Sequence, residues 1–168
     1  MAQRNVITVP DEILSKKSKD VTSFDDKLWV LLDDMYDTLI SYNGVGIAAV
    51  QVGILRRVIV IDMADMETPL ELINPEIVTV KGRQRELEGC LSVPGEWGYV
   101  NRPEYIKVKY LNRYGKPQTV EATELLAIAL CHEIDHLNGV IFSSIADEML
   151  DHEPTEEELE SRRGKRRR

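Results

Sequence analysis

The chain has little of what marks a secreted or a membrane-bound protein. Two cysteines among 168 residues are too few for a disulfide framework, and no apolar run approaches the roughly 20 residues that span a bilayer. The opening stretch, MAQRNVITVPDE, lacks the apolar segment of a signal peptide. These absences predict a cytoplasmic protein with no membrane partner, in a compartment where thiols stay reduced.

Acidic residues outnumber basic ones over most of the chain, but not in its last eight residues. The formal net charge is −8, yet residues 161–168 carry six positive charges and no acidic residue. Such a terminus is either a solvated tail or an electrostatic contact with nucleic acid, and both interpretations stay open. No repeat or linker precedes it. We therefore expect one domain at residues 1–150 and a charged tail at residues 151–168.

The hydrophobic pattern predicts two helices and several strands. A helix is expected at residues 25–42, with Ser23 opening a capping box before it. Strands are expected at residues 57–63, 71–73, 77–80, 105–111 and 118–121, and the last two flank a turn. A second helix should begin near Thr123 and end at Asn138 and Gly139. Strand and helix do not alternate regularly, so the predicted class is α+β with mostly antiparallel sheet.

The stretch HEIDHLNGVIF begins in the second predicted helix and holds two of the chain's three histidines. His132 and His136 are four residues apart, so their imidazoles lie on one helix face and can bind the same metal ion. Glu133 could then reach a water at that ion. An ordinary polar helix surface is the alternative. Against it, the same face carries apolar residues that are predicted to be buried: Leu125, Ile128 and Ala129.

The HExxH pattern alone leaves the third metal ligand unassigned. The extended peptidase pattern would place a histidine where this chain has Phe142, and His152 lies in an acidic stretch after the domain. Cys131 precedes His132, and a rotation of about 100° per residue points its thiol away, so we expect a buried thiol. Cys90, in the stretch EGCLSVP, is compatible with a core position or with a ligand. Because the two-histidine site needs another ligand, Cys90 is the leading candidate.

A third segment, GVGIAAVQ at residues 44–51, combines small residues with one amide. Gly44 and Gly46 form a GxG, but Ala49 replaces the third glycine of a dinucleotide fingerprint, and the segment follows a helix instead of a strand. The small residues instead predict the close passage of another backbone. Gln51 could present its amide at that place.

Together these segments resemble the peptide deformylase family, whose motifs GxGxAAxQ, EGCLS and HExDHLxG occur in this order. Here they read GVGIAAVQ (44–51), EGCLS (88–92) and HEIDHLNG (132–139). The resemblance implies an α+β fold whose mostly antiparallel sheets pack around a central helix carrying HEIDH. It also implies a metal-dependent hydrolase that removes the N-formyl group from the initiator methionine of nascent polypeptides and releases formate.

The resemblance also assigns catalytic roles at the matching positions. One divalent metal, expected to be Fe²⁺ with Zn²⁺ or Ni²⁺ able to substitute, would be held by Cys90, His132 and His136. Glu133 would act as general base and acid. The Gln51 amide and the Leu91 backbone N–H would stabilise the oxyanion that develops during hydrolysis.

The implied partner is an N-formyl-methionyl nascent peptide, with no role for DNA. Its backbone would pair as an added strand with Val45, Gly46 and Gly89. An apolar slot for the methionine side chain would be formed by Leu125, Ile128 and Ala129 together with Val45. The basic tail becomes a candidate contact with the ribosome. The chain departs from the family at Trp97, where several bacterial members carry an arginine. Separately, we expect an ion pair between Asp135 and Arg102.

Two other functions are weighed against this one. The alternative enzyme is an HExxH metallopeptidase, which Phe142 and the lack of an obvious downstream acidic ligand disfavour. The alternative class is a metal-binding or ribosome-associated module without turnover. Glu133 counts against it, since a structural metal site needs no base beside an open position.

Overall fold

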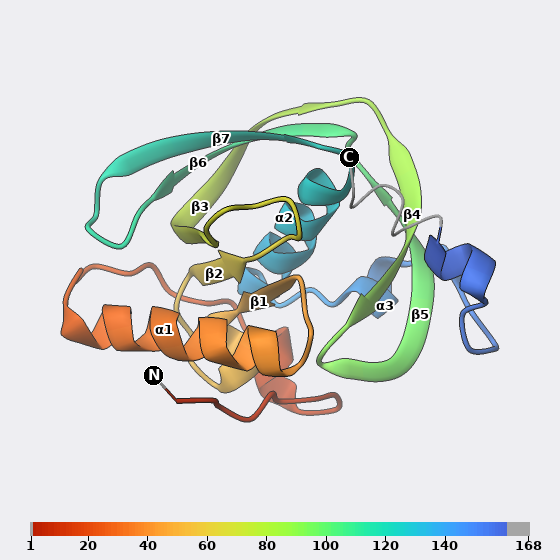
Figure 1. Cartoon of the computed structure of the whole chain (residues 1–168), viewed down its shortest axis with the longest axis horizontal. Helices are drawn as coiled ribbons and strands as arrows, with labels where there is room; N and C mark the ends of the chain where they lie inside the picture. Colours follow the sequence, from red (N-terminus) through yellow and green to blue (C-terminus); the bar gives the residue numbers. More distant parts are fainter. Residues whose placement is uncertain (1, 161–168) are drawn as a thin grey trace.

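The computed structural model describes residues 2–160, which form two antiparallel sheets and a helix enclosed between layers (Figure 1). The larger sheet has the order β1-β2-β3-β6-β7, and the smaller has the order β4-β5-β8. The larger contains β1 (Gly46–Ala48), β2 (Val58–Ile61), β3 (Leu70–Lys81), β6 (Tyr105–Leu111) and β7 (Pro117–Thr123). The smaller contains β4 (Gln84–Cys90), β5 (Val93–Arg102) and β8 (Glu148–Met149).

Helix α2 (Glu124–Leu137) occupies the centre of the molecule (Figure 1). It packs against β1, β2, β7 and the short helix η2 (Ala49–Val52), and 11 of its 14 residues are buried. Helix α1 (Asp26–Ser41) also contacts β1 and β2 and belongs to a second apolar cluster. Two shorter helices complete the fold, η1 (Glu12–Ser15) and α3 (Phe142–Ile145). The predicted class and the central position of the HEIDH helix are both confirmed.

Helix α1 begins one residue later than predicted and uses a different cap. Asp25 is the N-cap, and its side chain accepts a hydrogen bond from the Leu28 backbone N–H at 3.3 Å. The predicted capping role of Ser23 is therefore wrong, because the chain turns into the helix two residues further on. The predicted stop is confirmed: Tyr42 caps the helix, and Asn43 takes a positive φ of 55°.

The predicted strands are partly confirmed. Those near residues 57–63, 105–111 and 118–121 correspond to β2, β6 and β7. The two predicted at residues 71–73 and 77–80 are one strand, β3, which continues through Asn74 and Pro75 with a shifted register to β6. Strands β4 and β5 were not predicted. Their inward-facing residues include the charged Glu88 and Arg102, so no clean alternation of apolar and polar residues marks them.

The end of α2 is fixed by contacts with two distant segments. Arg57 donates from Nη1 to the Leu137 carbonyl at 3.0 Å, and the Ser18 backbone N–H donates to the same oxygen at 2.8 Å. Gly139 follows with a φ of +76°, and a Cβ built on it would lie 2.4 Å from the Ser15 carbonyl oxygen. The N-terminal segment therefore packs directly on the end of the helix that carries HEIDH.

Replacing Gly139 with alanine is expected to cost about 2–4 kcal/mol of unfolding free energy, because backbone strain and a steric clash add. Gly95→Ala is the matched control: its φ is +80°, but nothing lies within 4 Å of the added carbon. We expect that control to cost roughly 1–2 kcal/mol, from the left-handed backbone alone. Urea denaturation of both variants measures the difference. Equal losses would contradict the packing of residue 15 on α2.

Among residues 2–160, none of the helices combines the length and the apolar character that a bilayer crossing requires. The basic end of the predicted tail, residues 161–168, lies outside the described residues.

Candidate metal centre

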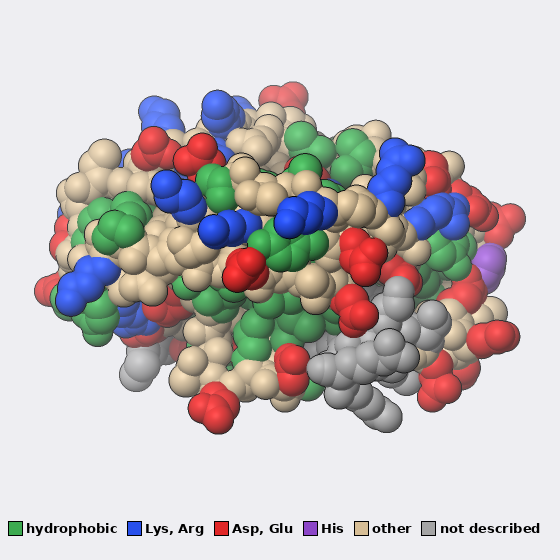
Figure 2. Space-filling view, turned by 90° about the horizontal axis from the view of Figure 1, so that it is seen from above, with side chains coloured by type: hydrophobic (Ala, Val, Ile, Leu, Met, Phe, Trp, Pro, Cys, Tyr) green, Lys and Arg blue, Asp and Glu red, His purple; other side chains and the backbone are tan. Residues whose placement is uncertain are grey.

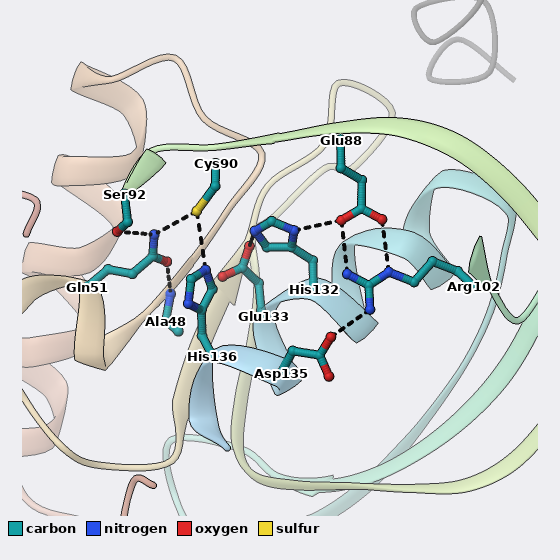
Figure 3. Close-up of polar contacts among 10 residues, drawn as sticks. All are labelled: Ala48, Gln51, Glu88, Cys90, Ser92, Arg102, His132, Glu133, Asp135 and His136. Atoms are coloured by element: carbon teal, nitrogen blue, oxygen red, sulfur yellow. Dashed lines mark hydrogen bonds and ion pairs between the residues drawn. The ribbon is translucent and has the colours of Figure 1, made fainter. Parts of the chain in front are cut away.

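The two histidines of HEIDH face the interior from one side of α2. His132 and His136 are 8% and 0% exposed, and their ring centroids are 5.1 Å apart. Both project toward the loop end of strand β4 (Figure 3). One helical turn therefore delivers two imidazole nitrogens to a single buried point.

Cys90 reaches the same point from the last position of β4. The pairing of β4 with β5 shifts register between Glu88 and Cys90, so that Cys90 pairs with Val93 at the end of the hairpin. Its Sγ lies 3.3 Å from His136 Nε2 (Figure 3). Ligand atoms of Cys90, His132 and His136 all lie within 4.8 Å of one another, and they are the only such group among the described residues.

This donor set fits a divalent transition-metal ion. One thiolate and two imidazoles are ligands typical of Zn²⁺ and Fe²⁺, and three protein ligands leave a position for water. Burial and the neighbouring charge of His132 lower the pKa of His136 well below its ordinary value. Burial also lowers the pKa of His132, but the carboxylate of Glu133 and hydrogen bonds outweigh it and raise that pKa.

His132 is oriented by residues that no prediction assigned to the site. Its Nδ1 donates to Glu88 Oε1 at 2.9 Å, which leaves Nε2 as the metal-facing nitrogen. Arg102 donates twice to Glu88, from Nε and Nη2, both at 2.9 Å. It also donates from Nη1 to Asp135 at 2.6 Å (Figure 3), which confirms the predicted pair of Asp135 and Arg102. Glu88, the first residue of the EGCLS motif, is thus a buried carboxylate that binds both His132 and Arg102.

The charge of Glu88 depends on Arg102. Burial raises the pKa of Glu88, yet hydrogen bonds from Arg102 and His132 outweigh it and lower the pKa from 4.5 to about 2. A carboxyl group whose pKa is lower in the fold stabilises the fold above its unfolded pKa. This contribution is lost as the pH falls from about 5 towards 2.

Arg102→Met is therefore expected to cost about 3–5 kcal/mol near neutral pH, because it leaves a buried carboxylate without its cation. The loss should shrink below about pH 5, where Glu88 takes up a proton in the variant. Denaturation across this pH range, with chelator present in both proteins, measures it. Arg85→Met, which removes surface ion pairs with Asp147 and Glu148, is the control and should change little. A loss that is independent of pH would contradict the assignment.

Glu133 lies beside the ligand group with one oxygen free for a reactant. It is 5% exposed, and its Oε1 has no hydrogen-bond partner among the described residues. Burial, partly offset by the charge of His132, raises its pKa from 4.5 to about 7. A Cβ at Gly46 would lie 2.9 Å from Oε2, so a side chain at position 46 would displace the Glu133 carboxylate. Gly44 and Gly46 thus make room mainly for side chains, those of Leu39 and Glu133, and not, as predicted, for another backbone.

Gln51 presents its amide nitrogen to the same space. Its Oε1 accepts from the Ala48 N–H at 2.9 Å, which fixes the orientation of the amide. Its Nε2 then points toward Ser92 Oγ at 3.0 Å and Cys90 Sγ at 3.7 Å (Figure 3). Ser92 is fully buried and was not predicted to take part, since nothing in the sequence pairs it with a residue 41 positions away.

A cavity of about 330 Å³ opens over these groups. Gln51, Cys90, Leu91, His132 and Glu133 line it. So do all six residues predicted to hold the substrate: Val45, Gly46, Gly89, Leu125, Ile128 and Ala129. Tyr42, Asn43 and Trp97 line it as well, and no prediction had placed them there. The predicted catalytic and substrate residues therefore share one space with two of the three predicted metal ligands.

The residues rejected as ligands lie as expected. The Phe142 ring stacks on His132 with centroids 6.0 Å apart, so it packs where the extended peptidase pattern has a histidine. His152 is half-exposed and contacts Asp151 and Glu158. Cys131 is buried, and burial raises the pKa of its thiol to about 11.

Comparisons with known proteins identify the family. The family model described as polypeptide deformylase matches residues 3–151. Peptide deformylase from Acetivibrio thermocellus is 51% identical over 168 residues, which is all of this chain and 95% of that protein. Peptide deformylase 1 from Bacillus subtilis is 49% identical over 144 residues, covering 86% and 90% of the two chains.

Solved structures agree with the sequence relatives. A peptide deformylase from Legionella pneumophila superimposes with a TM-score of 0.84 at 40% identity, covering 99% of this chain and 94% of that one. The enzyme from Ehrlichia chaffeensis in complex with actinonin gives 0.84 at 39% identity, covering 88% and 90%. The metallopeptidase alternative is not favoured. The chain belongs to the polypeptide deformylase family, metalloenzymes that hydrolyse the N-formyl group from nascent peptides.

Proposed function

We propose that this chain deformylates initiator methionine with one divalent metal held by Cys90, His132 and His136. The observation that carries the proposal is the convergence of a thiol and two imidazoles within 4.8 Å beside a cavity. We expect Fe²⁺ as the native ion, with Zn²⁺ or Ni²⁺ able to substitute, because a thiolate ligand favours softer ions. When bound, the ion supplies Lewis acidity to a water and to the formyl oxygen.

Glu133 is the proposed general base and acid. It takes a proton as the water oxygen bonds to the formyl carbon, and it returns that proton to the amine nitrogen as the carbon–nitrogen bond breaks. Formate and a free amine result. A pKa of about 7 suits both transfers, since a catalytic group works best when its pKa lies near the operating pH.

Gln51 and Leu91 are the proposed donors to the oxyanion that develops on the formyl oxygen. The Gln51 amide is already oriented by the Ala48 N–H, so little reorganisation is required during the reaction. Leu91 follows Cys90 directly and lines the same cavity. Fixed donors of this kind stabilise charge that exists in the transition state and not in the substrate.

The substrate peptide is proposed to bind as an extended strand between two segments. Val45 and Gly46 offer backbone groups on one side and Gly89 on the other. The methionine side chain would pack against the apolar wall that α2 presents to the cavity, formed by Leu125, Ile128 and Ala129. A thioether suits such a wall because it is apolar and conformationally adaptable.

Anaerobically purified protein offered formyl-Met-Ala-Ser, with and without chelator, tests the proposal. Formate release that chelation abolishes and added Fe²⁺ restores is the expected result. Cleavage at an internal peptide bond would instead identify a metallopeptidase. Bound metal without either product would identify a module without turnover, and both of these outcomes would overturn the proposal.

We further propose a cytoplasmic enzyme whose domain spans residues 1–150 and whose tail, residues 151–168, contacts the ribosome. The support is the run of six positive charges in the sequence of residues 161–168, which contrasts with the acidic side chains that gather at one end of the described surface (Figure 2). Contacts with ribosomal RNA by such a run depend on salt. Ribosome pelleting at low and high salt, with the full chain and a chain truncated after Glu160, tests it. Binding that survives truncation would rule the tail out.

A further inference from the structure

The helix that carries HEIDH begins at a residue with an unfavourable backbone conformation. Glu124, the first residue of α2, has a φ of +50°. Two other non-glycine residues among residues 2–160 have a positive φ, Asn43 and Asn74, and asparagine tolerates this region because its short polar side chain can bond locally. Glutamate lacks this advantage, so the conformation of Glu124 must be imposed by its surroundings.

Gln84, the first residue of β4, holds Glu124 through its side-chain amide. Its Nε2 donates to the Glu124 carbonyl at 3.0 Å and to the Pro103 carbonyl at 3.0 Å, so both amide hydrogens are used. The Glu124 N–H in turn donates to the Glu104 carbonyl at 3.1 Å. Thr123, the N-cap residue, makes no side-chain hydrogen bond to the helix. Contacts from β4 and from the β5–β6 connection therefore replace the usual cap.

Strand β4 contacts α2 at three points along its length. Besides the bond from Gln84 to the start of the helix, Glu88 binds His132 at 2.9 Å, and Cys90 Sγ lies 3.3 Å from His136 Nε2. Six steps along a strand and twelve along a helix both cover about 18–20 Å, so these contacts stay in step. Two of them belong to the metal centre. The bond from Gln84 fixes the other end of the helix.

The end of α2 that Gln84 holds forms the apolar wall of the catalytic cavity. Leu125 follows Glu124 directly and Ile128 comes next on the same face, and both line the cavity. Relaxation of Glu124 to a negative φ would turn the chain and carry Leu125 with it. The metal ligands begin about two turns further along, at His132, and have their own contacts with β4. They should keep their places.

We propose that Gln84 is a positioning residue for the substrate's methionine: it holds Glu124 in the left-handed conformation and so fixes the wall that begins at Leu125. This inference rests on the proposed function, since it concerns the slot in which the methionine side chain would lie. Gln84 is not among the residues that line the cavity. Its effect is therefore expected in KM and in the preference for methionine, whereas kcat and metal content should be kept.

Formate release from formyl-Met-Ala-Ser and formyl-Ala-Ala-Ser, by the full-length, metal-loaded protein, tests this inference. Gln84→Leu should raise KM for the methionine peptide by about 3- to 10-fold, the effect of losing one hydrogen bond, and should narrow its kcat/KM advantage over the alanine peptide by the same factor. Glu124→Val should act in the same way, because a β-branched residue resists a positive φ. Gln118→Leu, the same substitution at an exposed position of β7 outside the cavity, should change neither value.

Rescue by glycine separates this role from a general loss of stability. Glycine adopts a positive φ without strain, so Glu124→Gly should keep the wild-type preference for methionine. In the double variant it should also restore that preference to Gln84→Leu, because the conformation at position 124 no longer has to be imposed. Metal analysis should show the same metal content in all these variants as in the wild type.

An unchanged preference in both Gln84→Leu and Glu124→Val would overturn the inference, and so would a loss that Glu124→Gly does not restore. If Gln84→Leu does not fold, Glu124→Val and Glu124→Gly still decide, since equal preferences in these two would remove the role of the conformation at position 124. Failure of the proposed function gives another result, namely no formate from either peptide with the wild type.

Discussion

Glu133→Ala is expected to lower kcat for formate release by about 10²–10⁴, with the metal content unchanged. The carboxylate is not needed to hold the ion, because the ligand atoms that converge come from Cys90, His132 and His136. It is needed for proton transfer, since Glu133 Oε1 is buried without a partner among the described residues. The substitution Glu133→Ala removes this carboxylate and leaves the metal ligands in place.

Three measurements separate this role from a structural one. Formate release gives kcat. Metal analysis of the purified variant shows whether the ligands still hold the ion, and thermal denaturation shows whether the fold is kept. Glu67→Ala, at an exposed position between β2 and β3, is the matched control and should keep full activity. A Glu133→Ala variant that retained wild-type turnover would refute the assignment of the general base.

Cys90→Ala is expected to weaken metal affinity by more than about 100-fold and to abolish formate release. Loss of a residue that only orients a ligand already costs about 10- to 100-fold, and loss of the ligand itself should cost more. The remaining imidazoles, with centroids 5.1 Å apart, would hold the ion from one helix turn alone. Added Fe²⁺ should therefore not restore activity at concentrations that saturate the wild type.

The second cysteine provides the control. Cys131 precedes His132 on α2, is buried, and belongs to the apolar cluster around that helix. Cys131→Ala should keep one bound metal per chain and should affect only stability, by the cost of a small cavity. Stoichiometric metal in Cys90→Ala, or loss of metal in Cys131→Ala, would contradict the ligand assignment.

The parts of the site that the sequence predicted are those with local spacing or a motif. His132 and His136 follow from the helical repeat, and the stop at Gly139 follows from the left-handed residue that ends α2. Cys90 became a candidate because a two-histidine site lacked a ligand, and the hairpin does bring it there. Such inferences need only the geometry of one element or the chemistry of one ion.

The parts that were missed depend on pairing between distant segments. Glu88 and Arg102 neutralise each other across β4 and β5, yet each alone resembles a surface charge in the sequence. Ser92 contacts Gln51 only when the β4–β5 hairpin lies beside η2, and Trp97 contacts Gly89 only when β4 and β5 are paired. Charged residues in the interior also hid β4 and β5 from the strand pattern, because that pattern assumes apolar residues inside.

The two histidines and the cysteine of the metal centre lie in parts of the fold that differ in how deeply they are buried. The imidazoles are carried by a helix with 11 of its 14 residues buried, whereas the thiol ends a strand of the smaller sheet. Local opening is easiest where fewer buried contacts must break. Escape of the ion should thus begin with the hairpin lifting away while the helix stays intact. Amide hydrogen exchange faster in β4 than in α2, and quickened further by chelation, would be its signature.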